Sequence, residues 1–207
     1  MMLLLFACTA ETRTDRIVVA GDLVAVEVEM DAGTVRVRAT DGDRVEVERR
    51  GVAGEVRHTL RDGVVRIVDA CDAWLPCDTD LVVSIPARLA VDVSVGSGDV
   101  RVEGLGADLH VEVNDGDVDL SGIRSPTVRV QVGWGDVDLA FEGVPTDVAV
   151  SVGVGDVQLR VPEGAYDLDV ESLAAPQVRI PHDPSGARIY VRTTSGRARI
   201  ERLTVGH

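Results

Sequence analysis

The chain has 207 residues, a length that predicts one domain or one domain with a short extension. All 21 basic residues are arginine, which excludes a P-loop lysine, a Schiff-base lysine and a Ser-Lys catalytic pair. A formal net charge of −14 argues against a nucleic-acid partner, because phosphates repel such a surface. Hydrophobic residues make up 45% of the chain but aromatic residues only 3%, so we expect an aliphatic core.

The chain begins with an apolar stretch, residues 1–7 (MMLLLFA), which is followed by Cys8. The tetrapeptide LFAC resembles the lipobox of bacterial lipoproteins, and this resemblance implies that Cys8 is lipidated. The stretch has no basic leader and is short beside the roughly 7–15 apolar residues of a secretory signal, so a frayed apolar terminus is the alternative. We expect residues 1–16 to be a signal or lipoprotein anchor and tether, and this anchor to be the only membrane contact.

Residues 17–207 are expected to form a single continuous β domain, since no Pro/Gly/Ser-rich linker divides them. Within it, residues 17–90 are predicted to be a hairpin-rich layer that covers the first coil of the repeats described below. Apolar residues alternate with polar ones over 25–50 and 55–68, a pattern typical of strands. Both segments are expected to form hairpins, with glycine-containing turns at 31–33, 41–43 and 61–63.

Two cysteines, Cys71 and Cys77, remain once Cys8 is assigned to the lipid. Their five intervening residues suit a small disulfide-closed loop, and the flanking Asp, Pro and Trp residues indicate a surface position. A pair of free thiols is the alternative. A zinc site would need two further ligands, which the histidines do not supply at finger-like spacing.

From residue 91 to residue 203 the sequence repeats itself. Four segments align on a Gly-Asp pair whose glycines are 18, 19 and 20 residues apart: VSVGSGDVRV (93–102), VEVNDGDVDL (111–120), VQVGWGDVDL (130–139) and VSVGVGDVQL (150–159). Valines alternate on either side of each pair, which predicts two short strands joined by a tight turn with positive φ. Such units bury one face only and must stack on one another, so we expect a β-solenoid with about 18–21 residues per rung. An antiparallel sandwich is the competing architecture.

Two degenerate units follow the fourth repeat, over residues 170–180 and 191–200. The glycine of the last unit, Gly196, lies 41 residues after Gly155, a separation of two rungs. We therefore expect the stack to end near residue 203 at an open strand edge. The residues expected to protect this edge from pairing with other chains are Arg188, Arg192, Arg197, Arg199 and Arg202.

A strand that ends in Ile-Pro (LVVSIPARLAVDVSVGSGDVRVEGL), followed by regularly spaced G-D-V motifs, resembles the bacterial putative-adhesin family. The resemblance covers roughly residues 25–203. It implies a right-handed parallel β-solenoid that is exported or anchored at the cell envelope and has no established catalytic activity. It assigns no functional residues.

No catalytic constellation is found in the sequence, which lacks the G-x-S-x-G and H-E-x-x-H motifs and a G-x-G-x-x-G after a strand. Trp134 occupies a turn where the other repeats carry smaller side chains. Its ring either lies across Val154 of the next rung or is exposed for gripping a sugar or a protein.

Acidic residues recur beside the predicted turns and should stack into a column about 4.8 Å apart from rung to rung. The candidate members are Asp115, Asp117, Asp119, Asp136 and Asp138. Such a column would bind calcium weakly, and the alternative is a solvated acidic face. No confident metal site or other cofactor is predicted.

Together these features predict a non-enzymatic, envelope-anchored, adhesin-like interaction module. A self-assembling scaffold and a carbohydrate-active enzyme are the alternatives. The expected partner is a protein or a glycan, and the chain is expected to be a monomer or to associate weakly end to end.

Overall fold

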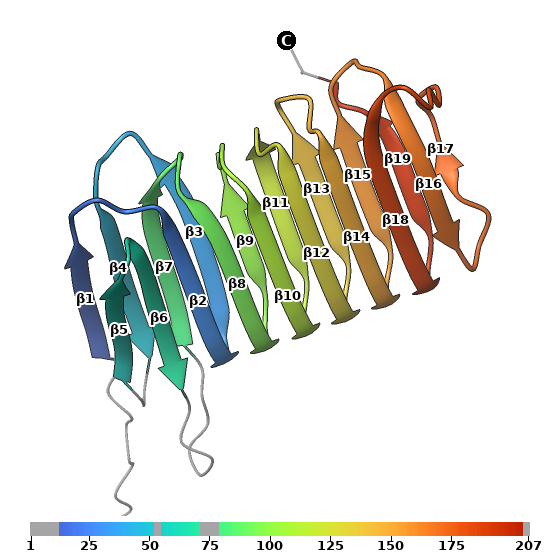
Figure 1. The fold of residues 1–207 in the computed structure, drawn as a ribbon. Coiled ribbons are helices and arrows are strands. Elements are labelled where there is room, and N and C mark those ends of the chain that lie inside the picture. Colours follow the sequence, from blue (N-terminus) through green and yellow to red (C-terminus); the bar gives the residue numbers. More distant parts are fainter. Residues whose placement is uncertain (1–12, 52–54, 71–78, 205–207) are drawn as a thin grey trace, which may run out of the picture.

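A computed structural model of the chain describes residues 13–51, 55–70 and 79–204. These residues form strands, turns and loops and contain no helix (Figure 1). The predicted all-β class is therefore confirmed.

The strands form two sheets. Sheet A has ten strands, in the order β1 (Arg13–Val19), β4 (Val45–Gly51), β7 (Thr79–Pro86), β3 (Thr34–Thr40), β9 (Val100–Glu103), β11 (Val118–Ile123), β13 (Val137–Phe141), β15 (Val157–Val161), β19 (Ala198–Arg202) and β17 (Gln177–Val178). Sheet B has nine, in the order β16 (Tyr166–Ser172), β18 (Ala187–Ser195), β14 (Asp147–Val154), β12 (Thr127–Trp134), β10 (Leu109–Asp115), β8 (Ala90–Ser97), β2 (Ala25–Ala32), β6 (Val64–Ala70) and β5 (Glu55–Arg61).

The repeating unit is a rung that contains one strand of each sheet. In the rung of β12 and β13, the chain leaves sheet B, turns at Gly135-Asp136 and enters sheet A, and a longer connection then leads to the next rung (Figure 1). The alternating valines and leucines of both strands point between the sheets and are fully buried, for example Val130 and Leu139. Burial of these aliphatic side chains on a period of two holds the rungs together.

Neighbouring rungs pair in parallel and in register. Val118 lies opposite Val100 on one side and Val137 on the other, and Val137 lies opposite Val157. Only three pairings within the described residues are antiparallel, and all three lie at the end of the stack that contains β1 and β5.

The corner glycines have the positive φ that the sequence predicted. Gly116 has φ 149° and Gly135 has φ 139°. A Cβ on Gly135 would lie 2.0 Å from the carbonyl oxygen of Gly116, and a Cβ on Gly116 would lie 2.1 Å from that of Gly98. The corners of successive rungs are therefore too close together for any other residue at this position.

The predicted hairpin over residues 25–50 is not formed. β2 and β3 lie in different sheets and make a rung of the same kind as the later ones. Gly33 between them has φ 126° and approaches the carbonyl oxygen of Thr79, which is the geometry of a stacked corner and not of a hairpin turn. The parallel stack thus includes residues from 25 onward, whereas the sequence predicted its start at residue 91.

A hairpin is formed by β5 and β6. Its two turn residues, Asp62 and Gly63, have φ values of 51° and 78°, as a tight hairpin turn requires. This agrees with the strand pairing that the sequence predicted for residues 55–68.

The order of rungs in the stack is not the order of the chain. The rung of β6 and β7 lies outside that of β2 and β3, and the rung of β18 and β19 lies between that of β14 and β15 and that of β16 and β17 (Figure 1). The predicted open edge at Arg197 and Arg199 is therefore wrong, because β19 has neighbours on both sides.

A physical reason for the inner position of β18 and β19 lies in their side chains. Ile189, Val191 and Ile200 are completely buried, whereas Leu168 and Val170 of β16 are only half-buried. The final rung also has a complete corner, since Gly196 lies directly against the carbonyl oxygen of Gly155. The more apolar rung fills the inner place and the more polar one covers the end.

Candidate functional site

A groove of about 530 Å³ crosses the outer face of sheet A beside the tight corners. We call it the sheet A groove. Its floor and walls come from β9, β11, β13, β15, β17 and β19 and the corners that precede them. Six carboxylates line it: Asp99, Asp117, Asp119, Asp136, Asp138 and Asp156. Three guanidinium groups also line it, those of Arg101, Arg197 and Arg199.

Strand alternation places these side chains on the outside. In each rung the residue after the corner glycine faces outward, the next residue is a buried valine or alanine, and the following residue faces outward again. Because the rungs are in register, these outward positions form two parallel columns along the stack.

The first column is joined by side-chain hydrogen bonds and is called here the aspartate ladder. The backbone N–H of Asp117 donates to Oδ1 of Asp99 over 3.2 Å. The N–H of Asp136 donates to Oδ1 of Asp117 over 2.8 Å, and that of Asp156 donates to Oδ1 of Asp136 over 2.7 Å. The backbone N–H groups on either side of each corner aspartate bond to carbonyls of the next rung, so the carboxylates satisfy the one N–H that the sheet leaves over.

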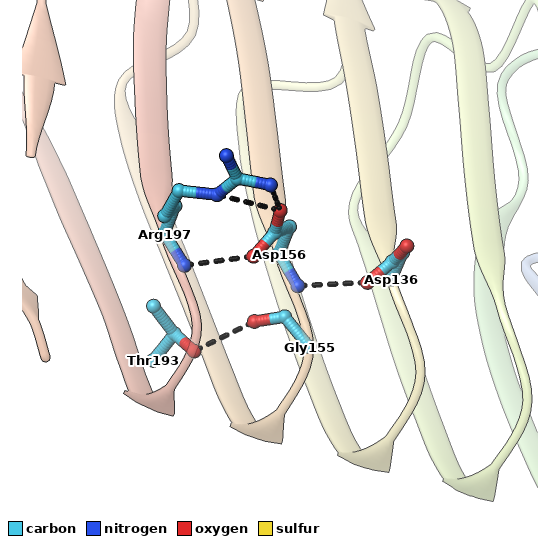
Figure 2. Close-up of polar contacts among 5 residues, drawn as sticks. All are labelled: Asp136, Gly155, Asp156, Thr193 and Arg197. Carbon is cyan, nitrogen blue, oxygen red and sulfur yellow. Dashed lines mark hydrogen bonds and ion pairs between the residues drawn. The ribbon is translucent and has the colours of Figure 1, made fainter. Parts of the chain in front are cut away.

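Arg197 ends the ladder (Figure 2). Its backbone N–H donates to Oδ1 of Asp156 over 2.9 Å, and its Nε and Nη2 donate to Oδ2 over 3.1 and 2.8 Å. These hydrogen bonds lower the pKa of the Asp156 carboxyl below its ordinary value. Nearby, Thr193 Oγ1 donates to the carbonyl of Gly155 over 2.8 Å and holds the last corner in place (Figure 2).

The structure brings four of the five predicted column residues into the groove. Asp117 and Asp136 belong to the ladder, while Asp119 and Asp138 lie opposite each other two residues further on. Asp138 also forms an ion pair with Arg160. Asp115 lies at the corner and does not line the groove.

The predicted weak calcium site gains no support from this geometry. Within residues 13–51, 55–70 and 79–204 no group of three or more acidic, histidine or cysteine side chains is arranged to hold a metal ion. Hydrogen bonding to the next rung explains the ladder aspartates without a cation.

Sequence reasoning missed the role of Arg197. The signal was present, because Arg197 occupies the aspartate position of the last repeat, where Gly-Arg replaces Gly-Asp. An arginine there can end a ladder of acceptors that an aspartate would have continued.

Trp134 lies at the tight-corner edge, 55% exposed, between Asp115 and Val154 in the register of sheet B. Val154 is 46% exposed, so neither side chain covers the other fully. The pair forms a small apolar step on an otherwise polar edge.

Other predicted residues fall elsewhere. Cys8, Cys71 and Cys77, with their predicted lipid and disulfide, lie outside the described residues. The part of the chain that is described has no helix long and apolar enough to cross a membrane.

Residues 88–181 match the Toastrack DUF4097 family. The matched segment is a little under half of the chain and extends from β8 to the segment after β17, so it contains most of the aspartate ladder.

Solved structures resemble nearly the whole chain. A putative adhesin from Bacteroides fragilis is 16% identical, with a TM-score of 0.56 and coverage of 94% of this chain and 98% of its own. A putative cell adhesion protein from Clostridium sporogenes is 9% identical, with a TM-score of 0.52 and coverage of 93% and 100%. At these identities the likeness is one of fold. No match was found among curated proteins.

The Toastrack match and these neighbours confirm the resemblance that the sequence suggested, to a bacterial putative-adhesin-like family of unknown function.

Proposed function

We propose that the chain is a non-catalytic, adhesin-like interaction module of the bacterial cell envelope, and that the sheet A groove is its binding surface. The observation that carries this proposal is the make-up of the groove. Among the residues that the structure describes, its lining consists of aspartate, arginine, glutamine, valine and alanine, and none is a histidine, serine, threonine or cysteine. Such a lining supplies many hydrogen-bonding groups and lacks the hydroxyl or thiol nucleophile and the histidine base of a hydrolase triad.

The groove is also well suited to hold a polar ligand in one orientation. Its side chains stand on parallel strands in strict register, and the ladder ties each corner to the next. Binding therefore requires little ordering of the protein, which favours affinity. The groove presents carboxylates, guanidinium groups and the amides of Gln158 and Gln177, a mixture suited to a glycan or a polar protein segment.

Three finer features belong to this proposal. The chain is exported and held at the envelope by a lipid on Cys8, Cys71 pairs with Cys77, and the coil of the solenoid is right-handed. The resemblance to putative adhesins supports an envelope location.

A binding screen tests the proposal. Labelled full-length chain is applied to arrays of bacterial and host glycans and of envelope and extracellular-matrix proteins. The variant Arg101→Gln/Arg199→Gln removes two charges from the groove, whereas Arg129→Gln/Arg188→Gln removes two charges from the outer face of sheet B and is the matched control.

We expect the groove variant to bind at least about tenfold more weakly than the parent, since a charge-assisted hydrogen bond contributes roughly 1.5–3 kcal/mol. The control variant should bind within about twofold of the parent. Equal binding by parent and groove variant, no retained ligand at all, or cleavage of a retained glycan would overturn the proposal.

A further inference from the structure

The two edge strands of sheet B differ in charge: β5 carries two arginines and one glutamate, whereas β16 carries three carboxylates, of which Glu171 also forms an ion pair with Arg192 of β18 over 3.6 Å. At one end the edge strand is β5, with Arg57 and Arg61 exposed. At the other end the edge strand is β16, whose outward-facing side chains are those of Asp167, Asp169 and Glu171. An end with arginines and an end with carboxylates are complementary surfaces on the same chain.

The register of sheet B aligns these charges. Strand pairing leads across the sheet from Arg61 through Val64, Ala25 and Ala90 on one side, and from Asp167 through Arg188, Asp147 and Thr127 on the other. Leu109 of β10 lies opposite both Val91 and Val128, so both paths extend to Asp108, directly before β10, and Arg61 and Asp167 lie at the same level of the stack. A copy stacked in the same direction would place Arg61 opposite Asp167 and Arg57 opposite Glu171.

The backbones are compatible with this register. Ala187 N donates to the carbonyl of Ala165, so the backbone N–H and C=O groups of the odd-numbered residues of β16 point toward β18. The backbone N–H and C=O groups of Leu168, Val170 and Ser172 therefore point toward the open side of the strand. In β5 the pair Arg61–Val64 flanks a two-residue turn, so the backbone groups of Arg61 bond to β6. By alternation, the backbone N–H and C=O groups of Val56, His58 and Leu60 point toward the open side of β5. Because β5 is antiparallel to the rest of its sheet, the contact would be an antiparallel pair with His58 opposite Val170.

A strap, residues 181–186, covers the start of the β16 edge. Its Asp183 N donates to the carbonyl of Tyr166 over 2.8 Å, and the N–H of Leu168 donates to Nδ1 of His182 over 3.1 Å. His182 thus occupies the position that Leu60 of a second copy would take. The His182 side chain is 54% exposed, so it can leave this position without breaking the core.

We propose that the β5 end of one copy docks on the β16 end of another, head to tail, in competition with the His182 strap. Two β16 edges would bring carboxylates together and two β5 edges would bring arginines together, so charge selects the head-to-tail arrangement over a symmetric dimer. The competing strap keeps the association weak and reversible. This inference concerns the ends of the stack and is independent of the ligand of the sheet A groove.

Sedimentation velocity of the full chain over a concentration series tests it, with circular dichroism as the check on folding. The parent should associate weakly, and His182→Ala should associate about fivefold more tightly, since it removes one competing hydrogen bond of about 1 kcal/mol. His110→Ala, on β10 in the middle of sheet B, is the matched control and should behave as the parent.

Charge-reversal variants provide the decisive part of this experiment. Arg57→Glu/Arg61→Glu alone and Asp167→Arg/Glu171→Arg alone should each be monomeric, and a mixture of the two variants should associate again, because each then meets an end of opposite charge. A monomeric His182→Ala variant at the highest soluble concentration, or a mixture of folded variants that stays monomeric, would overturn the proposal.

Discussion

At three successive corners between the sheets, an aspartate uses one carboxylate oxygen to accept the N–H of the aspartate in the next rung. The bond needs an acceptor but no charge, and the stacked carboxylates repel one another by roughly 1 kcal/mol at this spacing in water. The repeated aspartate is therefore explained by its role as hydrogen-bond acceptor for a backbone N–H of the next rung. The sequence-based interpretation as an acidic column did not include this role.

Two substitutions of Asp136 separate the effect of its hydrogen-bond acceptor from the effect of its negative charge. Asp136→Asn keeps an oxygen toward Asp156 N–H and relieves repulsion, so its free energy of unfolding should equal or exceed that of the parent. Asp136→Ala leaves that N–H without its acceptor and should lose about 1 kcal/mol. Urea denaturation measures both, and an Asn variant as unstable as the Ala variant would contradict the ladder.

The close packing of the corner glycines leads to a second prediction. Gly135→Ala places a Cβ at 2.0 Å from the carbonyl oxygen of Gly116, in addition to the strain of a φ of 139°. Gly21→Ala has the same kind of strain, at φ 143°, with no atom within 4 Å of the added Cβ. We expect Gly135→Ala to be less stable than Gly21→Ala by about 2 kcal/mol or more. Equal losses in urea denaturation would show that close stacking of the corners is not the cause.

Asp156 gives the ladder a pH dependence. Hydrogen bonds from Arg197 lower the pKa of the Asp156 carboxyl in the folded chain. The stabilisation of the fold that this ion pair contributes is therefore complete above the unfolded pKa of about 3.9, and it is lost as the pH falls through the lower folded pKa. Arg197→Ala should therefore melt below the parent at pH 6, by a few degrees at most because the pair is exposed, and the gap should close in strong acid. Arg101→Ala, three strands away from Asp156, is the control. A gap that persists unchanged in acid would contradict this linkage.

Among the elements, β4 and β6 are joined by a buried ion pair that links the two sheets. Arg49 is 1% exposed and Asp69 2%, and Arg49 Nε donates to Asp69 Oδ1 over 3.0 Å. Arg49 Nη2 also donates to Thr79 Oγ1 of β7 over 3.3 Å. The signal for this pair was in the sequence, since Arg49 continues the inward positions of Val45 and Val47.

Removal of one partner should be costly. Arg49→Met leaves the Asp69 carboxylate buried without its cation and is expected to lose about 3–5 kcal/mol, while Arg49→Met/Asp69→Leu should recover most of that loss. Chemical denaturation of the single and double variants compares them. A double variant no more stable than the single one would show that Arg49 acts through packing alone.

Two glycine turns with similar local sequence lead the chain in different directions. Gly33 and Gly63 both follow alternating strands, yet the chain crosses to the other sheet at Gly33 and folds back in the same sheet at Gly63. The local pattern is similar at both turns. What differs is the rung against which each turn stacks, and this is a property of distant residues.

For the whole molecule, the period of two and the regular Gly-Asp steps were sufficient to predict strands, corners and a stacked core. They could not predict the order of the rungs, because repeats with the same inward valines fit beside one another in many orders. The choice at the C-terminal end depends on the buried side chains of 187–202 and on the polar edge of β16. The groove depends on that choice, since Arg197 and Arg199 reach it only if β19 lies beside β15.

Disulfide trapping tests this placement directly. Both variants are made in a background in which the three native cysteines are replaced by serine. Val154→Cys/Ser195→Cys joins residues that lie opposite each other in neighbouring strands. Val154→Cys/Ala174→Cys joins positions that would be neighbours only if the rungs followed chain order. Mild oxidation should close an intramolecular disulfide in the first variant and not in the second. A disulfide formed only in the second variant would contradict the stack and the groove built on it.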